Sequence, residues 1–529
     1  MRIKKLLSGN FIKQFALLII ISAGLNIVSG QRLPKSFASN ASAGDVTPRG
    51  NTVEKVLLVN DTIWAATSKG LSKSTDKGNS WTNYYGTTPF GTESVSAVAY
   101  GNGIIAASTW HFESTSQGRL PVGTGIKIST NYGKSWISAS QPLDMFADTV
   151  VAYGSNSIKA LPVTTEVQNF IRDIAIIDNT IWVVSNSSGL RKSSNLGSTW
   201  ERVLLPPDNL DSIKPTDQLI FQLRPKAGTV GNLNHIGFSI LAVGRDTLYV
   251  GTAGGINKSV DGGISWTKFS HQNQRNPISG NHILKIRLNQ FDNSIWAATW
   301  KAEAQEEFWG ISYTKDGGQN WKTVLNDSRT LDILFPEIKS GAAVTGTDII
   351  ALTQDGLYRS SNNGITWMLN PKIADSQRNI TLLSDLFLGG AVDNSKTPAE
   401  LWFGTGDGLV RLKQITSNFW DGDWKIFFAS EQLNSKDDSY AFPNPFPPGG
   451  TVRIKYSLAS NANVTIRIFD FGMNLVKTVI QNLPRNAGES FDLWNGRDEA
   501  GNLVPNGVYF YRIDINNEKP LYGKIIAVR

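Results

Sequence analysis

The chain has 529 residues, a formal net charge of +7, 40% hydrophobic residues and no cysteine. This length is enough for roughly two to four domains, and the absence of cysteine excludes disulfide scaffolds, Cys-ligated zinc, thiol catalysis and a lipidated N-terminal cysteine. With 18% charged residues, the composition fits neither a disordered chain nor a multi-span membrane protein.

Residues 1–30 have the layout of a secretory signal peptide. Four basic residues are followed by an apolar stretch at 15–21 and by small residues before Gln31. The apolar stretch is shorter than the roughly 20 residues that a spanning helix needs, although an uncleaved anchor is the alternative. Removing the leader leaves a net charge of +3, which gives no electrostatic case for nucleic acid. We expect a linker at 31–52 and no membrane span after signal removal.

An octet with the pattern Ser/Thr-x-Asp/Asn-x-Gly-x-Ser/Thr/Asn-Trp then recurs six times. Its Asp or Asn side chain can accept backbone N–H bonds across a turn, and its glycine suits a position of positive φ. We expect the octets to be structural turns whose tryptophan fills the space between neighbouring repeats. Their Asp or Asn and Trp residues are Asp76 and Trp81, Asn131 and Trp136, Asn195 and Trp200, Asp261 and Trp266, Asp316 and Trp321, and Asn362 and Trp367.

A second repeated string accompanies the octets, from TIWAATSKGLSKS at 62–74 to ELWFGTGDGLVRL at 400–412. Each of the seven resulting units can be divided into four short strands separated by turn residues. No long helical period interrupts them. The sequence therefore predicts an all-β protein with a seven-bladed β-propeller over residues 53–436.

The octet resembles the Asp-box, or bacterial neuraminidase (BNR) repeat, of sialidases, other β-propeller glycoside hydrolases, sortilin-type receptors and photosystem assembly factors. In those families the box is a staple of the fold on the side away from the active site, which implies a structural role for the octets here. The second string is also similar to two-component-regulator propeller repeats, most closely at 401–409 (LWFGTGDGL).

Nearly all variation in loop length falls on one predicted face of the propeller. The loops between second and third strands carry insertions at 111–123 and 301–310, and long connections between blades run through 137–170 and 201–240. Because function usually lies where loops vary on a rigid frame, we expect any ligand on this face.

The two insertions supply the candidate ligand-binding residues Trp110, His111, Trp300 and Trp309. Aromatic rings beside carboxylates suit carbohydrate, because sugar C–H faces stack on rings while hydroxyls bind carboxylates. The alternative is that these tryptophans only hold their loops in place.

The sequence gives little support for catalysis. Glycosidic hydrolysis needs two placed carboxylates, and Glu113, Glu303, Glu306 and Glu307 are candidates that no spacing pairs. The Arg-Ile-Pro segment and arginine triad of sialidases are not matched. The four histidines show no metal-ligand spacing, so we expect no metal or cofactor, with calcium left open.

The last part of the chain reads as a second domain. A Pro/Gly-rich linker at 437–450 precedes alternating strands over 451–529, which predict a small β-sandwich. The segments PNPF (443–446), IFDFGMNLV (468–476) and LWNGRDEAGNLVPNGVYFYRI (493–513) resemble the type A C-terminal sorting domain of type IX secretion substrates, itself similar to the Ig-like domain of flagellar hook-capping proteins.

That resemblance implies passage through the type IX secretion machinery to the outside or the surface of a Gram-negative-type bacterium, with cleavage or anchoring left open. An accessory sandwich without a transport role is the alternative. We expect a monomeric, non-catalytic binding protein for a glycan or protein ligand. A glycoside hydrolase and an assembly or scaffold factor are the alternatives.

Overall fold

The computed structural model describes residues 35–38, 43–378, 380–415, 419–428, 433, 437–516 and 518–528. The predicted signal peptide at 1–30 lies outside these residues. The chain divides into unit 1 (Met1–Ile380 and Asp385–Ala429) and unit 2 (Thr381–Ser384 and Ser430–Arg529). Both are built from β-strands, which confirms the predicted all-β class.

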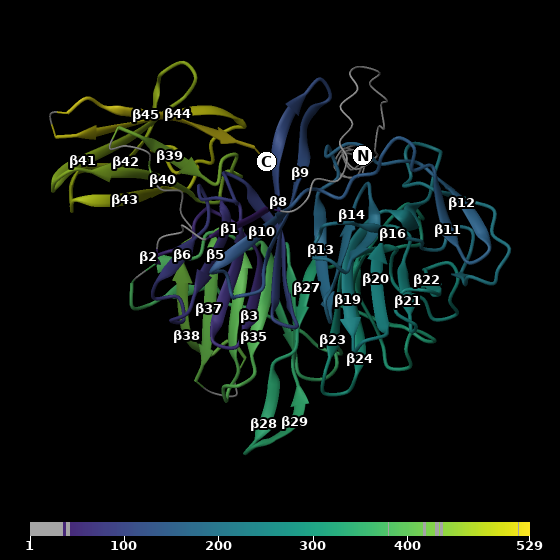
Figure 1. The fold of residues 1–529 in the computed structure, drawn as a ribbon. Helices are drawn as coiled ribbons and strands as arrows, with labels where there is room; N and C mark the ends of the chain where they lie inside the picture. The colour runs from purple at the N-terminus through teal and green to yellow at the C-terminus, as the bar shows by residue number, and fades with distance from the viewer. Residues whose placement is uncertain are drawn as a thin grey trace, which may run out of the picture. The chain divides into compact units, whose positions relative to one another are not determined.

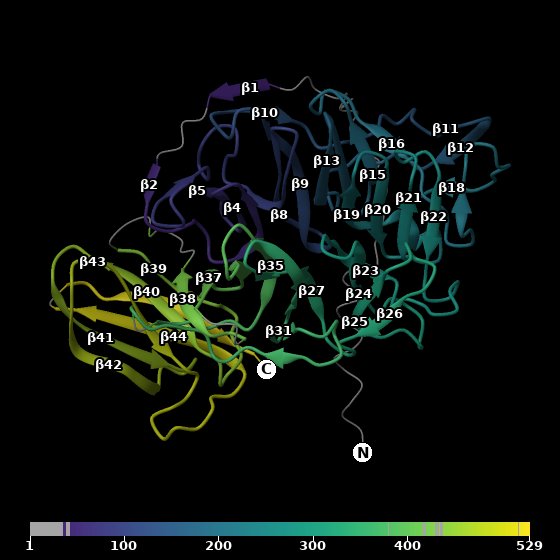
Figure 2. The same cartoon turned by 90° about the horizontal axis from the view of Figure 1, so that it is seen from below.

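Unit 1 contains, in its described residues, seven antiparallel sheets that each include the four strands of one repeat (Figure 1), which we number blades 1 to 7 in chain order. The first strand of each blade contacts the first strand of the next, and that of blade 7 contacts that of blade 1. The contacts therefore close a ring, seen along its axis in Figure 2, and unit 1 is a β-propeller.

The bounds of the strands in blades 1 to 4 are as follows. Blade 1 has β3 (Val53–Val59), β4 (Thr62–Thr67), β5 (Gly70–Ser74) and β6 (Trp81–Asn83), and blade 2 has β7 (Ser94–Gly101), β8 (Ile104–Thr115), β9 (Gly118–Ser129) and β10 (Ser135–Ala139). Blade 3 has β13 (Ile171–Ile177), β14 (Thr180–Ser185), β15 (Gly189–Ser193) and β16 (Glu201–Val203), and blade 4 has β19 (Gly237–Val243), β20 (Thr247–Thr252), β21 (Ile256–Ser259) and β22 (Trp266–Phe269).

Blades 5 to 7 complete the ring. Blade 5 has β23 (His282–Asn289), β24 (Ser294–Trp300), β25 (Gly310–Thr314) and β26 (Lys322–Val324), and blade 6 has β27 (Thr330–Leu334), β30 (Ile349–Thr353), β31 (Gly356–Ser360) and β32 (Met368–Leu369). Blade 7 has β35 (Phe387–Asp393), β36 (Glu400–Thr405), β37 (Gly408–Gln414) and β38 (Gly422–Phe427), while β33 (Ala374–Asp375) and β34 (Ile380–Thr381) lie between blades 6 and 7 in sequence.

The segment predicted as a linker before blade 1 instead contains two strands. β1 (Lys35–Ala38) pairs with β10 on the outer edge of blade 2, and β2 (Ala43–Asp45) pairs with β6 on the outer edge of blade 1. Pattern alone missed them because each is too short to show alternation. They cover edge strands that would otherwise present unpaired backbone groups.

The octets lie between the third and fourth strands, and their side chains close the turns. In the first octet, Asp76 accepts a hydrogen bond from the Ser80 backbone N–H (2.8 Å), and Gly78 N–H donates to the Ser74 hydroxyl (2.8 Å). In the fifth, hydrogen bonds from the Asn320 side chain and backbone lower the pKa of Asp316 to about 2. The hydroxyl and carboxylate thus satisfy backbone donors that a tight turn leaves unpaired.

The octet tryptophans fill the seams between blades. Trp136 of blade 2 meets Trp64 of blade 1 edge to face at 6.1 Å, and Trp81 of blade 1 meets Phe427 of blade 7 at 6.3 Å. Five of the six are buried, while Trp367 is half-buried. Trp367 of blade 6 packs against a core cluster that contains Trp296 and Tyr313 of blade 5, so the seam between blades 5 and 6 depends less on this plug than the other seams that have one.

The long connections form structure of their own on the outside of blades 3 and 4. β11 (Val150–Tyr153), β12 (Asn156–Ala160) and β18 (Gln222–Leu223) form a small sheet, β17 (Ser212–Ile213) pairs with β22, and η1 covers Leu233–His235. Apolar side chains of this sheet pack into one core with Trp182 and Trp266. These two connections cover a seam, so their length does not mark a ligand site.

One insertion departs from the expectation that length variation falls on a single face. β28 (Glu337–Ser340) and β29 (Ala343–Thr347) form a hairpin between the first and second strands of blade 6. Figure 1 shows it projecting at the opposite end of the ring from the β8–β9 hairpin. We call the end that carries the β8–β9 hairpin the variable-loop face, and the other end the octet face.

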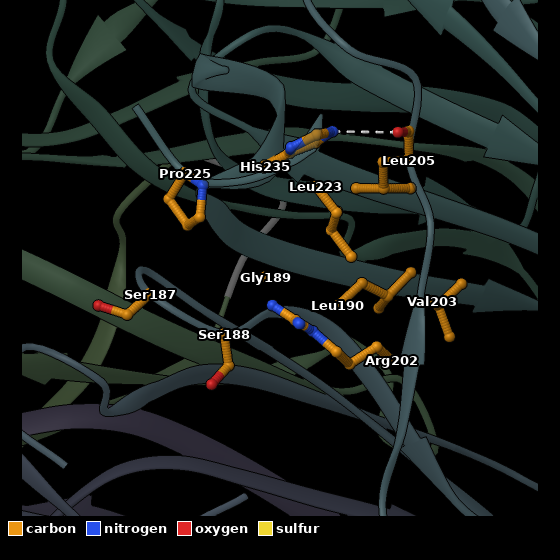
Figure 3. A pocket seen from close by; sticks show the side chains of 10 residues that line it. All are labelled: Ser187, Ser188, Gly189, Leu190, Arg202, Val203, Leu205, Leu223, Pro225 and His235. Carbon is orange, nitrogen blue, oxygen red and sulfur yellow. Dashed lines mark hydrogen bonds between the residues drawn. The ribbon is translucent and has the colours of Figure 1, made fainter. Parts of the chain in front are cut away.

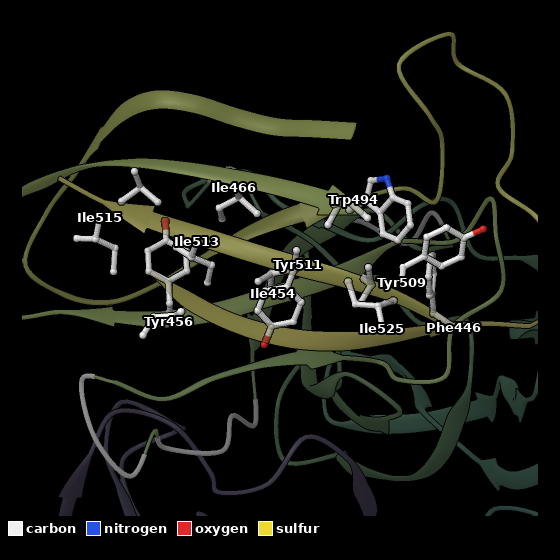
Figure 4. Close-up of a cluster of buried hydrophobic side chains, with 14 of the residues drawn as sticks. Phe446, Ile454, Tyr456, Ile466, Trp494, Tyr509, Tyr511, Ile513, Ile515 and Ile525 are labelled. Atoms are coloured by element: carbon white, nitrogen blue, oxygen red, sulfur yellow. The ribbon is translucent and has the colours of Figure 1, made fainter. Parts of the chain in front are cut away.

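Unit 2 is a sandwich of two antiparallel sheets. β39 (Ser439–Phe442) already pairs with β40 inside the segment predicted as a linker. The core between the sheets contains Phe446, Trp494, Tyr509 and Tyr511 (Figure 4). One sheet has β39, β40 (Val452–Leu458) and β43 (Gly488–Trp494), and the other has β42 (Leu475–Arg485), β41 (Ala462–Phe469), β44 (Gly507–Ile515) and β45 (Leu521–Ala527).

Candidate functional site

The first strand of each blade, which we call its inner strand, has the same irregularity in its pairing near its start. In each, the pairing with the second strand skips one residue, which is a β-bulge. A bulge leaves one residue unpaired and redirects its side chain. The skipped residues face no partner in the second strand and are Glu54, Ser96, Arg172, Phe238, Leu284, Leu331 and Leu388.

Two of these bulge residues belong to a chain of ring contacts that crosses four blades on the variable-loop face. We call it the aromatic ladder. Its successive ring–ring or guanidinium–ring distances are 4.6, 4.8, 5.2, 4.8, 5.1 and 5.6 Å, within the range of favourable aromatic and cation–π contacts. In order, the members are Arg119, Phe112, Trp110, Phe170, Arg172, Phe238 and His282.

The ladder is partly open to solvent. Phe112 is 46% exposed, and Trp110, Phe170 and Phe238 are half-buried. Because these rings are partly buried, their orientation is fixed, and because they are partly exposed, they present apolar surface to a ligand. This is the arrangement of side chains that recognition sites use, because rigid aromatic groups lose little conformational entropy on binding.

Charged groups surround the middle of the ladder. The Arg172 guanidinium lies between Phe170 and Phe238, and its Nε donates to Asn186 Oδ1 at 2.5 Å. Burial lowers the pKa of Arg172 to about 10 against the opposing charge of Glu54. Burial also raises the pKa of Glu54 to about 7, although Lys55 and Arg172 oppose the shift.

His282, at the last position of the ladder, is held neutral. Burial lowers the pKa of His282 to about 4, although Glu303 opposes this shift. A neutral imidazole next to Phe238 therefore presents a ring with both donor and acceptor capacity at neutral pH.

Salt bridges tie the inner strands together. Arg287 of blade 5 binds Asp332 of blade 6 through two hydrogen bonds of 2.8 and 2.6 Å, and Lys285 reaches Asp173 of blade 3 at 2.7 Å. Burial raises the pKa of Asp332, but the Arg287 charge outweighs it and holds the value at about 2. These groups are internally satisfied, and we assign them to stiffening the ring rather than to ligand contact.

The structure brings two of the four predicted ligand-binding residues to the ladder. Trp110 is a member, and His111 beside it places Nδ1 2.8 Å from Glu93 Oε2. Trp300 instead donates its indole N–H to the Thr330 carbonyl (2.6 Å), and Trp309 lies under the Arg329 guanidinium at 4.8 Å. Both tryptophans of the blade 5 insertion thus hold it against blade 6.

The four predicted carboxylates have different surroundings in the described structure. Glu307 is buried and accepts hydrogen bonds from the Ala302 backbone and the Asn281 and Gln272 side chains, which shapes its loop. Glu303 pairs with Lys226 at 2.6 Å, whereas Glu113 and Glu306 are exposed on their loops.

The long connection before blade 4 holds a small cavity of about 10 Å³, room for about one water molecule (Figure 3). Its wall includes Arg202 and His235. The His235 Nδ1 accepts the Arg224 backbone N–H at 3.1 Å, and its Nε2 donates to the Leu205 carbonyl at 3.2 Å. This histidine therefore fastens the connection and is too enclosed to act on a ligand.

Sequence reasoning missed Phe170, Arg172, Phe238 and His282. They come from three separate places in the sequence, at 170–172, 238 and 282, and each place has an ordinary strand-start pattern. Their common position at the start of inner strands was the available signal, since Phe238 and Arg172 both follow a short turn segment and precede an apolar run. Arg172 and Phe238 are marked out only by the bulge, a tertiary feature, and Phe170 and His282 only by their ring contacts.

No protein-family description and no curated protein matches this chain. Among solved structures, YCF48 bound to D1 peptide is 11% identical, with a TM-score of 0.41, covering 73% of this chain and 97% of that one. The WD40 β-propeller domain of Doa1 is 9% identical, with a TM-score of 0.36 and coverages of 70% and 93%. PorZ, a surface component of the type IX secretion system of Porphyromonas gingivalis, is 14% identical, with a TM-score of 0.21 and coverages of 90% and 87%. Similarity at this level transfers no role.

Two features are absent from the residues that the structure describes. Within the ranges given above, no helix has the length and apolar character needed to cross a bilayer. The same ranges hold no group of three or more His, Cys, Asp or Glu side chains arranged to bind a metal ion.

Proposed function

We propose that this chain is a non-catalytic binding protein that acts outside the cell and holds a glycan or protein ligand across the aromatic ladder. The observation that carries the proposal is the continuous run of ring and guanidinium contacts from blade 2 to blade 5. A run across four blades suits an extended ligand, because each half-buried ring offers one stacking position on a rigid frame.

The test measures retention of the protein, with residues 31–529 present, on a panel of immobilised polysaccharides and surface proteins, and product release in the same samples. Phe112→Ala and Phe238→Ala should weaken binding about tenfold, the loss expected for an aromatic contact. Phe291→Ala is the matched control, since Phe291 is 48% exposed on the octet face, close to the 46% of Phe112.

Equal retention of Phe112→Ala and Phe291→Ala would contradict the proposal. Product release that disappears in Glu54→Gln or Glu93→Gln would favour the glycoside hydrolase instead. Capture of a protein complex that survives both ladder variants would favour the assembly or scaffold role.

We also propose that unit 2 directs export through type IX secretion. The segments that carry the resemblance are physically joined: Asn444 donates to the Lys524 carbonyl at 2.8 Å, and Phe446 N–H donates to the Ile526 carbonyl at 2.9 Å. The PNPF segment therefore fixes the last strand, which supports reading the two as one recognition element. Deleting 437–529 should leave the protein in the periplasm, and normal delivery to the surface would contradict the proposal.

A further inference from the structure

The seams between blades carry a repeated lysine contact. In blades 1 and 4, a lysine of the third strand lies over an aromatic ring of the second, with Lys73 5.1 Å from Trp64 and Lys258 5.7 Å from Tyr249. Each ammonium also donates to the next blade, Lys73 to the Tyr132 carbonyl (2.8 Å) and Lys258 to the Gly317 carbonyl (3.0 Å). Both carbonyls belong to the fourth residue of an octet, so the lysine closes the seam.

The seam between blades 3 and 4 has a lysine at the equivalent position, but this lysine makes a different contact. Lys192 lies 5.5 Å from the Trp182 ring, and the corresponding octet residue is Gly262. Here the ammonium turns to Glu201, with Nζ 3.6 Å from Oε2. Gly262 holds the octet position whose carbonyl Lys73 and Lys258 bind in the other seams, and here it lies in the wall of a cavity.

One residue of the fourth strand accounts for the difference. Lys73 and Lys258 stand opposite Thr82 and Thr267 in their blades. Lys192 stands opposite Glu201. A carboxylate in this position attracts the ammonium within its own blade, whereas threonine leaves it free to reach across the seam.

The opened seam contains a cavity of about 260 Å³ on the octet face. Water occupies about 30 Å³ per molecule, so this space is large enough for a ring-sized ligand. Trp182 and Ile177 supply apolar surface, and Thr180 supplies a hydroxyl. Ser194 supplies a second hydroxyl, and the lining also contains two acidic and two basic side chains, namely Asp178, Glu201, Lys192 and Arg245.

The charges of this lining balance, and their pairing is loose. Arg245 lies 3.4 Å from Asp178 and Lys192 lies 3.6 Å from Glu201, both beyond the usual 2.7–3.2 Å of a hydrogen bond. Each group therefore keeps hydrogen-bonding capacity. Carboxylates accept from hydroxyls, while ammonium and guanidinium groups donate to them.

We infer that this seam pocket binds a neutral sugar ring, at a site separate from the aromatic ladder. A neutral polyol matches a lining with no net charge, since its hydroxyls can donate to Asp178 and Glu201 and accept from Lys192 and Arg245. Its C–H faces can lie against Ile177 and the Trp182 edge. A charged sugar would meet a carboxylate or a cation of its own sign.

The test uses the mature full chain with D-glucose, D-galactose and D-mannose as separate probes, followed by ligand-observed NMR. At least one hexose should bind with millimolar affinity. Glu201→Thr restores the residue found in blades 1 and 4, and it should weaken binding about tenfold by releasing Lys192 to close the seam. Thr82→Glu is the matched control in blade 1, and because it leaves the pocket between blades 3 and 4 unchanged, it should not weaken the hexose signal.

Three results would overturn the inference. One is equal binding by wild type and Glu201→Thr, and another is no signal from any of the three hexoses. The third is stronger binding of the zwitterion glycine than of every hexose. Phe112→Ala separates this site from the ladder, because it should weaken binding at the ladder about tenfold while leaving the seam signal intact.

Discussion

The seam between blades 1 and 2 and the seam between blades 3 and 4 share a buried indole and a lysine above it, yet only the first is closed. In the first, Lys73 reaches the Tyr132 carbonyl of the next blade. In the second, Lys192 pairs with Glu201 of its own blade and a cavity of about 260 Å³ remains. The two seams therefore share their apolar packing and differ in the residue that stands opposite the lysine, which is Thr82 in the first and Glu201 in the second.

The largest expected effects test whether the apolar halves of the two seams are equivalent. Trp136 and Trp266 are the octet tryptophans of the closed and the open seam, and both are almost fully buried. Replacing either by alanine should cost about 3–5 kcal/mol, because a large cavity replaces a packed indole. Chemical denaturation followed by tryptophan fluorescence measures the loss in each variant.

Trp367→Ala serves as the comparison, since this octet tryptophan is half-buried and should cost clearly less. A much smaller loss at Trp266 than at Trp136 would mean that the seam between blades 3 and 4 is loose throughout, rather than only at its edge.

Acid should weaken the connection that covers the open seam. Burial lowers the pKa of His235 to about 4, so between pH 6.5 and 4 the unfolded chain binds a proton that the folded chain does not. Stability from this group is present above pH 6.5 and falls as the pH drops towards 4, by at most about 3 kcal/mol. Denaturation midpoints at pH 7, 5.5 and 4.5 measure the slope.

His282 adds to the same slope because burial lowers its pKa to about 4 as well. His235→Gln should therefore flatten the pH dependence without abolishing it. An unchanged slope in that variant would show that His235 is not buried in its neutral form.

The smallest effect separates the two lysines directly. Lys73→Met removes a hydrogen bond to the next blade, whereas Lys192→Met removes a pair with a partner that is 69% exposed. We expect the first to cost about 1 kcal/mol more than the second. Denaturation of the two variants in parallel gives this difference, and a larger cost at Lys192 would reverse the assignment of open and closed seams.

Much of the fold was predictable because it is written in local patterns. Turn residues at fixed offsets, such as Ser74, Asp76 and Gly78, make their hydrogen bonds within a few residues, so each octet specifies its own turn. The alternation of short apolar runs specified strands and hence the all-β class. The strands β1 and β2 were missed because pairing on the outer edges of blades depends on partners far along the chain.

The sequence by itself determined the repeated strands and the octet turns, since these follow from contacts between near neighbours. The tertiary structure alone decided that Trp110 continues into Phe170, Arg172, Phe238 and His282, and that Trp300 and Trp309 are used for packing. It also decided that Lys192 leaves a seam open where Lys73 closes one. Closure of the ring brings together the starts of strands that are far apart in the sequence. The contacts that their side chains make therefore cannot be predicted from local patterns.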